Sequence, residues 1–212
     1  MAIPRITVLV SGRGSNLGAL LAAERAGTLS GAVSAVISNR PEAAGLATAT
    51  AHGVATAVVD HRRFGDRDAF DAALATAIDA SEPDLVLLAG FMRILGTAFV
   101  RRYQGRMLNI HPSLLPAYPG LHTHRRALED GVRIHGCTVH FVTPDLDHGP
   151  IVIQAAVPVR ADDDEATLAA RVLAQEHRVY PQAARWFLDG KLVIESGVVR
   201  VKGGDPQQLY AP

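Results

Sequence analysis

The sequence has a single cysteine and no excess charge of either sign. Cys137 has no partner for an internal disulfide and lies in an apolar segment, so we expect a buried thiol. Lys and Arg together number 21, as do Asp and Glu, and no block of basic residues is present. Because surfaces that bind polyanions normally carry such a block, we expect no nucleic-acid partner.

Long apolar runs are also missing. No stretch approaches the roughly 18 consecutive apolar residues of a membrane span, and the chain starts in a strand-like segment without the pattern of a signal peptide. We therefore expect no membrane partner and a cytoplasmic location. Hydrophobic residues make up 48% of the 212 residues, which suffices for a sizeable core, and we expect one domain over residues 1–212.

The first half alternates segments rich in β-branched residues with helical ones, a pattern typical of a parallel sheet flanked by helices. Gly27 is placed to end the first helix in a left-handed conformation, and the second helix is expected to begin at Pro41 and end at Gly53. We expect strands over residues 5–10, 32–38, 54–59 and 84–90, and helices over residues 15–27, 41–53 and 66–83.

The second half has a different pattern. We expect a strand before a proline-rich loop, then a helix, two strands and a long helix, over residues 106–110, 124–131, 134–142, 150–159 and 164–190. The connection between the two late strands is short and rich in Pro, Asp and Gly, which favours a hairpin, and Pro181 is expected to kink or interrupt the last helix. The predicted fold class is α/β, with a mostly parallel central sheet and antiparallel strands in the C-terminal half.

A glycine-containing turn, "SGRGSN", joins the first strand to the first helix. Exposed amides at a helix amino end favour an anion. A dinucleotide site is excluded because Leu17 stands where the third glycine is needed, and no Gly-Lys-Ser/Thr of a P-loop follows. Two interpretations remain: a site for a single phosphate, or a structural turn with Ser15 or Asn16 as the helix cap.

Polar residues gather where the strand over 106–110 ends. Alternate residues of a strand share a face, so Asn109 and His111 point together at the carboxyl edge of the sheet. Asp145 and Asp147 lie in the later connection, and each alone is typical of a turn. A carboxylate beside a histidine suits that histidine for proton transfer, and an asparagine can stabilise an oxyanion. Asn, His and Asp together indicate acyl-type transfer to a nucleophile on the substrate.

Histidine is concentrated in one part of the chain. Six of the nine histidines fall between His111 and His148, yet the usual zinc-ligand spacings are absent, so we expect no metal.

Six segments carry a family resemblance. In order, the chain contains "SGRGSN", "LAGFMRIL", "NIHPSLLPAYPGLHTH", "HGCTVHFV", "DLDHGPIV" and "QEHRVYP". This order and spacing, over nearly the whole chain, resemble the folate-dependent formyltransferase family, and "PGLHTH" resembles its phosphoribosylglycinamide (glycinamide ribonucleotide) branch. The resemblance implies a Rossmann-like formyltransferase fold, with a phosphate-binding half over residues 1–105 and a catalytic and folate-loop half over residues 106–212.

The resemblance implies transfer of the formyl group of 10-formyltetrahydrofolate, a co-substrate, to the amine of phosphoribosylglycinamide in purine biosynthesis. It implies that Asn109 stabilises the oxyanion, that His111 acts as general acid, and that Asp147 raises the pKa of His111. The implied phosphoribosylglycinamide contacts are Gly14, Ser15, Asn16 and Glu176. The implied folate contacts are Arg67, Met92, Arg93, Ile94, Leu95, Asn109, Thr143 and Asp147. In this family the Leu115–Pro116 bond is commonly cis.

Two alternatives to the transferase are open. A 10-formyltetrahydrofolate hydrolase uses the same three residue types but carries an extra amino-terminal regulatory domain, which we do not expect here. A non-catalytic folate-binding module has no need of a proton relay. Two departures from the family pattern are Arg13, in a variable position of the first turn, and His148, where the family often has a small residue. The expected partners are small-molecule substrates, with a homodimer left open.

Overall fold

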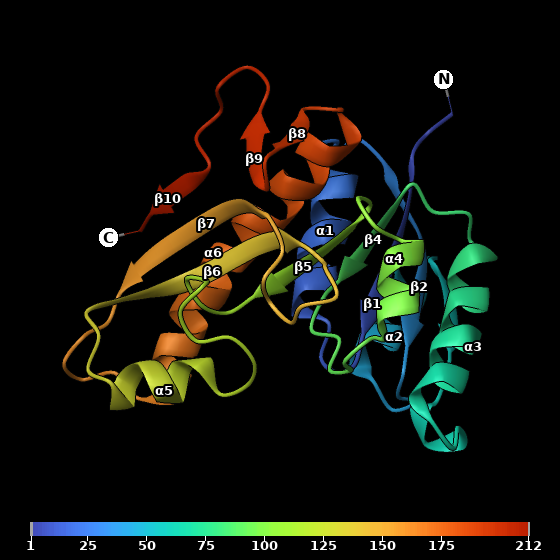
Figure 1. Cartoon of the computed structure of the whole chain (residues 1–212), viewed down its shortest axis with the longest axis horizontal. Coiled ribbons are helices and arrows are strands. Elements are labelled where there is room, and N and C mark those ends of the chain that lie inside the picture. The colour runs from blue at the N-terminus through green and yellow to red at the C-terminus, as the bar shows by residue number, and fades with distance from the viewer. Residues whose placement is uncertain (1, 212) are drawn as a thin grey trace.

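A single sheet of eight strands runs through the computed structural model, which describes residues 2–211. The strand order is β10-β7-β6-β5-β4-β1-β2-β3 (Figure 1). The strands are β1 (Arg5–Val10), β2 (Ala32–Ser38), β3 (Ala55–Val58), β4 (Leu85–Leu88), β5 (Met107–His111), β6 (Ile134–Phe141), β7 (Ile151–Pro158) and β10 (Gln208–Tyr210). Only β6 pairs antiparallel with its neighbours, while the other described pairs in this sheet are parallel. The predicted mostly parallel sheet is confirmed.

Helices cover both faces of the sheet. They are α1 (Ser15–Arg25), α2 (Ala44–Ala51), α3 (Arg67–Asp79), α4 (Thr97–Arg102), α5 (Thr123–Glu129) and α6 (Glu165–Leu188), with a 3-10 turn, η1 (His61–Arg63). One buried apolar cluster joins the sheet to α1 and α6, and a second joins it to α3 and α4. Within β1, Val8 belongs to the first cluster and Leu9 to the second, as expected when successive side chains point to opposite faces.

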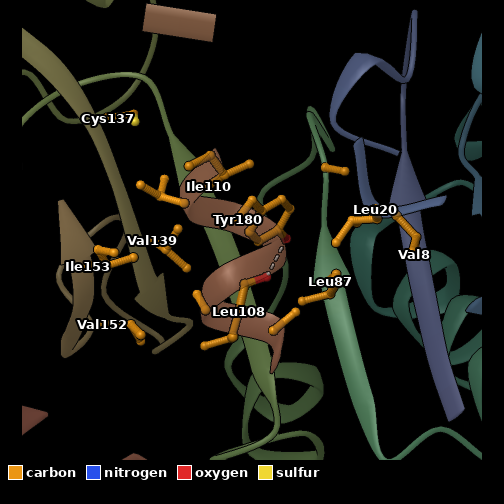
Figure 2. Packing of buried hydrophobic residues seen from close by; sticks show 14 of the residues in the cluster. Val8, Leu20, Leu87, Leu108, Ile110, Cys137, Val139, Val152, Ile153 and Tyr180 are labelled. Atoms are coloured by element: carbon orange, nitrogen blue, oxygen red, sulfur yellow. Dashed lines mark hydrogen bonds between the residues drawn. The ribbon is translucent and has the colours of Figure 1, made fainter. Parts of the chain in front are cut away.

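A buried tyrosine of α6 lies in the larger apolar cluster. Tyr180 is fully buried, and its hydroxyl lies 2.9 Å from the carbonyl oxygen of Leu88 and 3.2 Å from that of Leu108. One O–H thus serves carbonyls on the neighbouring strands β4 and β5. Figure 2 shows this ring among Leu87, Leu108 and other residues of the cluster. Burial raises the pKa of Tyr180 far above its usual value, so the hydroxyl keeps its proton.

Two predictions about proline are corrected in part: the predicted start of the second helix is wrong, and the last helix is not interrupted at Pro181. The second helix begins at Ala44 rather than Pro41, because residues 40–43 form a turn in which the amide of Ala43 donates to the carbonyl of Arg40. Proline suits such a turn because its φ is already set. Helix α6 continues through Pro181 without a break. Its apolar face packs against the sheet and α1, which outweighs the one hydrogen bond that proline removes.

The structure adds elements that the pattern did not predict. Helix α4, strand β10 and the hairpin of β8 (Leu192–Glu195) and β9 (Val198–Val201) were all missed. Ser196 and Gly197 join β8 to β9 and both have positive φ, the geometry of a tight hairpin turn. The Ser-Gly dipeptide was therefore a readable signal.

Several local predictions are confirmed. Gly27 and Gly53 have φ near 70°, with values of 69° and 73°. Cys137 is a buried free thiol, and the Leu115–Pro116 bond is cis. Within residues 2–211, no helix combines the length and the apolar character that crossing a bilayer requires.

Candidate active site

The predicted pair on β5 shares one face of the sheet. Leu108 and Ile110 belong to the buried cluster on the α1 and α6 side. Asn109 and His111 alternate with them and therefore face the opposite side, as the strand period requires. Across the antiparallel ladder Asn109 lies opposite His140 of β6. The carboxyl end of β5 thus presents an amide and an imidazole together.

His111 is held between two oxygen acceptors. Its Nε2 lies 2.9 Å from the carbonyl oxygen of Tyr118, to which it donates a hydrogen bond. Its Nδ1 lies 3.6 Å from Oδ2 of Asp147, and the side chains of both residues are only 7% exposed. Because each ring nitrogen faces an acceptor, a proton can be held on either one.

Asp147 rather than Asp145 reaches this site. Asp147 has φ 56°, an uncommon left-handed backbone conformation, and its Oδ2 accepts a 2.8 Å hydrogen bond from the amide of Gly120. This bond joins the loop after β6 to the proline-rich loop after β5. Asp145 is exposed and its carbonyl accepts from the hydroxyl of Thr143. The two aspartates of the connection are therefore not equivalent.

His140 is a site residue that the sequence reasoning missed. Its Nδ1 lies 2.9 Å from the carbonyl oxygen of Phe141 and therefore carries the proton, which leaves Nε2 free to accept from Nδ2 of Asn109 at 3.2 Å. Nε2 is also 3.8 Å from Oδ1 of Asp147. Burial lowers the pKa of His140 and keeps the ring neutral, against opposing effects of the Phe141 carbonyl and Asp147. The neutral ring of His140 accepts one N–H of the Asn109 amide and so orients it. The second N–H of Asn109 stays available.

The first turn has a glycine cap instead of a side-chain cap. Gly14 is the N-cap of α1 with φ 73°, and a Cβ there would lie 2.7 Å from Cα of Gly45. Both the conformation and the close approach require glycine. Neither Ser15 nor Asn16 caps the helix, so the predicted side-chain cap is wrong.

Asn16 instead points into the protein and meets Glu176. Its Nδ2 donates a 2.7 Å hydrogen bond to Oε2 of Glu176, a residue 160 positions away on α6. Oδ1 of Asn16 is buried without a partner. Burial raises the pKa of Glu176, and the bond from Asn16 opposes that rise. Two residues predicted to bind one substrate are therefore neighbours, with an unused acceptor beside them.

Residues 91–96 form an irregular segment with exposed apolar side chains. Met92 is 61% and Ile94 62% exposed, while the guanidinium of Arg93 lies 5.9 Å from the centroid of the Phe70 ring. Arg67 is exposed at the start of α3. The amide of Met92 donates to the hydroxyl of Ser11 at 2.7 Å. This bond joins the predicted folate contacts to the turn that leads into α1.

The two departures from the family pattern lie outside the central network. Arg13 and His148 are exposed, and Nδ1 of His148 donates to the carbonyl of Leu146 in its own loop at 2.7 Å. Within residues 2–211, no group of three or more His, Cys, Asp or Glu side chains is placed to hold a metal ion.

Known proteins resemble this chain over nearly its whole length. Residues 4–184 match the family described as formyl transferase. The phosphoribosylglycinamide formyltransferase of Escherichia coli is 51% identical over 207 residues, which are 97% of this chain and 98% of that protein. The trifunctional purine biosynthetic protein adenosine-3 of Drosophila melanogaster is 47% identical over 92% of this chain and 14% of that protein. The crystal structure of glycinamide ribonucleotide transformylase 1 from Symbiobacterium toebii superposes with a TM-score of 0.92 and 51% identity, covering 94% of each chain.

Proposed function

The chain belongs to the formyl transferase family, and we propose that Asn109, His111 and Asp147 perform the chemistry. The protein transfers a formyl group to phosphoribosylglycinamide, a step of purine biosynthesis. The observation that supports these three residues is the buried contact between Nδ1 of His111 and Oδ2 of Asp147 at 3.6 Å, beside the amide of Asn109. We infer 10-formyltetrahydrofolate as the donor, because the family uses it.

The reaction needs one oxyanion site and one proton donor. The substrate amine attacks the formyl carbon, the new C–N bond forms, and the carbonyl oxygen becomes an oxyanion. The free N–H of Asn109 donates to that oxygen. His111 then gives a proton to the folate nitrogen as the old C–N bond breaks, and the attacking amine loses one proton to solvent, so that protons balance. Asp147 stabilises the protonated ring of His111 before the transfer.

The two substrates approach this centre from different elements. We place the phosphate of phosphoribosylglycinamide at Gly14 and Ser15, where amides at the start of α1 favour an anion. Asn16 and Glu176 then meet the remainder of this substrate, Asn16 through its unused acceptor Oδ1. On this proposal residues 1–105 form the phosphate-binding half and residues 106–212 the catalytic half.

The folate lies on the irregular segment. Exposed apolar side chains such as Met92 and Ile94 offer a flat surface to a pterin ring, and nearby arginines suit the carboxylates of its tail. The proposed folate contacts are Arg67, Met92, Arg93, Ile94, Leu95, Asn109, Thr143 and Asp147.

A two-cuvette measurement tests the proposal. The protein is mixed with 10-formyltetrahydrofolate, with and without phosphoribosylglycinamide, and the folate absorbance and released formate are followed. We expect a change only when the amine is present. Formate release without the amine would favour the hydrolase, and folate binding without any turnover would favour the binding module.

Location and assembly remain predictions. We propose a cytoplasmic enzyme that acts on small molecules without a metal, a nucleic-acid partner or a membrane partner. Sedimentation at several protein concentrations tests whether it forms a homodimer.

A further inference from the structure

Asp71 of α3 is a buried carboxylate outside the network around His111. It is only 6% exposed, and its Oδ2 accepts a 2.7 Å hydrogen bond from the amide of Gly96. Its Oδ1 is buried without a partner. Burial raises the pKa of Asp71, while the Gly96 amide and the nearby Arg67 and Arg93 oppose the rise. Burying a carboxylate with a single direct partner costs free energy, because its other oxygen has no compensating hydrogen bond.

Gly96 is shaped to receive this carboxylate. Its φ is −71°, so any residue can adopt its backbone conformation. A Cβ at this position would nevertheless lie 2.8 Å from Oδ2 of Asp71, 3.7 Å from Oδ1 of Asp68 and 3.8 Å from Nε of Arg67. The distances to Asp68 and Arg67 are ordinary contacts, but a side chain at residue 96 would force the Asp71 carboxylate to shift.

The hydrogen bond from the Gly96 amide to Asp71 holds the C-terminal end of residues 91–96, the proposed folate-binding segment. At its other end the amide of Met92 donates to Ser11. Between these two bonds the chain has no regular structure and exposes Met92 and Ile94. Arg93 lies over the ring of Phe70, the residue before Asp71. The segment is therefore held at both ends, and α3 provides the second support.

We propose that Asp71 is a positioning residue for the folate donor, which fixes residues 92–96 and Arg67 as one rigid surface through its bond to Gly96. The inference rests on the proposed function. Arg67 and Asp71 are four residues apart on α3 and share one face, so the same carboxylate lies beside the arginine and beneath the end of the segment. Neither Asp71 nor Gly96 touches the reacting atoms.

The test separates donor binding from chemistry. In Asp71→Ala the amide of Gly96 loses its partner, and we expect the KM for 10-formyltetrahydrofolate to rise about tenfold. The KM for phosphoribosylglycinamide and kcat should stay within about twofold of the wild type, because the interaction lost is one of donor binding. Asp71→Asn keeps an oxygen that accepts from Gly96 and should restore the donor KM to within about threefold.

A matched control lies on the same helix. Asp79, at the other end of α3, bonds to Arg102 and to the hydroxyl of Tyr103 and therefore also ties α3 to the α4 region. Asp79→Ala should lower the thermal stability but leave the donor KM unchanged. An equal rise in donor KM in Asp79→Ala would overturn the inference, because the effect would then follow from general loosening of α3.

A double-variant cycle tests the contact itself. Gly96→Ala places a methyl group against the Asp71 carboxylate and should raise the donor KM as Asp71→Ala does. The double variant should be no worse than the stronger single variant, because both changes remove one contact. Additive effects, or an unchanged donor KM in an active Asp71→Ala enzyme, would overturn the inference. A wild-type protein without any formyl transfer would instead overturn the proposed function, and this inference with it.

Discussion

Asn109 and His140 lie opposite each other on β5 and β6, and Nδ2 of the amide is 3.2 Å from Nε2 of the imidazole. Since Nδ1 of His140 donates to the carbonyl of Phe141, Nε2 can only accept while the ring is neutral. The contact therefore determines which way the Asn109 amide faces. On the proposed mechanism, the remaining N–H of Asn109 is the donor to the developing oxyanion.

His140→Ala should reduce turnover without removing substrate binding. Loss of a residue that orients a catalytic group commonly costs about 10–100-fold, and we expect a fall of this size in kcat with little change in either KM. His140→Gln offers an amide oxygen in place of Nε2 and should recover part of the rate. The exposed neighbour of Asp147 serves as control, since His148→Ala should keep the wild-type rate. A larger effect in His148→Ala would contradict this assignment.

Asp147 and Asp145 make a matched pair for testing the proton relay. Asp147→Asn keeps the shape and the hydrogen bond from Gly120 but removes the charge 3.6 Å from His111. We expect kcat to fall about 10²–10⁴-fold, the usual contribution of general acid catalysis. Asp145→Asn, two residues away and exposed, should leave kcat unchanged. Equal activity in the two variants would remove Asp147 from the mechanism.

His135 should make the fold sensitive to acid. It is 1% exposed, and burial lowers its pKa from 6.5 to about 4. As the pH falls, the imidazole of His135 gains a proton in the unfolded chain before it does so in the folded protein. The contribution of neutral His135 to stability is therefore complete above pH 6.5 and is lost toward pH 4. The loss amounts to about 3 kcal/mol of unfolding free energy. His135→Phe keeps an aromatic ring beside Tyr118. Between pH 6.5 and pH 4, its free energy of unfolding in denaturant titrations should fall by about 3 kcal/mol less than that of the wild type. Identical pH dependence in both proteins would contradict the prediction.

Glu176 should have the opposite pH dependence. Burial raises its pKa, so its favourable contribution is complete below the ordinary value of 4.5 and is lost as the pH rises through the raised pKa. Glu176→Gln can still accept from Asn16 and carries no charge. Its unfolding temperature should therefore decrease less than that of the wild type between about pH 5 and pH 8. A parallel decrease would mean that the pKa of Glu176 is not raised in the folded protein.

The local pattern of the sequence accounts for most of the fold. Segments rich in β-branched and apolar residues located the strands of the parallel sheet, and Gly27 and Gly53 marked helix ends because only a residue without Cβ takes positive φ there at little cost. Short elements with weak patterns were missed, such as α4 and the β8–β9 hairpin. Helix α4 is short and packs against α3, and a local pattern does not record such a contact, whereas the β8–β9 turn carried the Ser-Gly signal.

By itself, the sequence determined that Asn109 and His111 share a face, since strand periodicity is a local property. The family resemblance selected Asp147, but only the tertiary structure places its carboxylate at His111, through a left-handed backbone and the amide of Gly120. The register of β5 against β6 brings His140 to Asn109, and the packing of α3 brings Asp71 to Gly96. These contacts join residues far apart in sequence, and their positions depend on how whole elements pack.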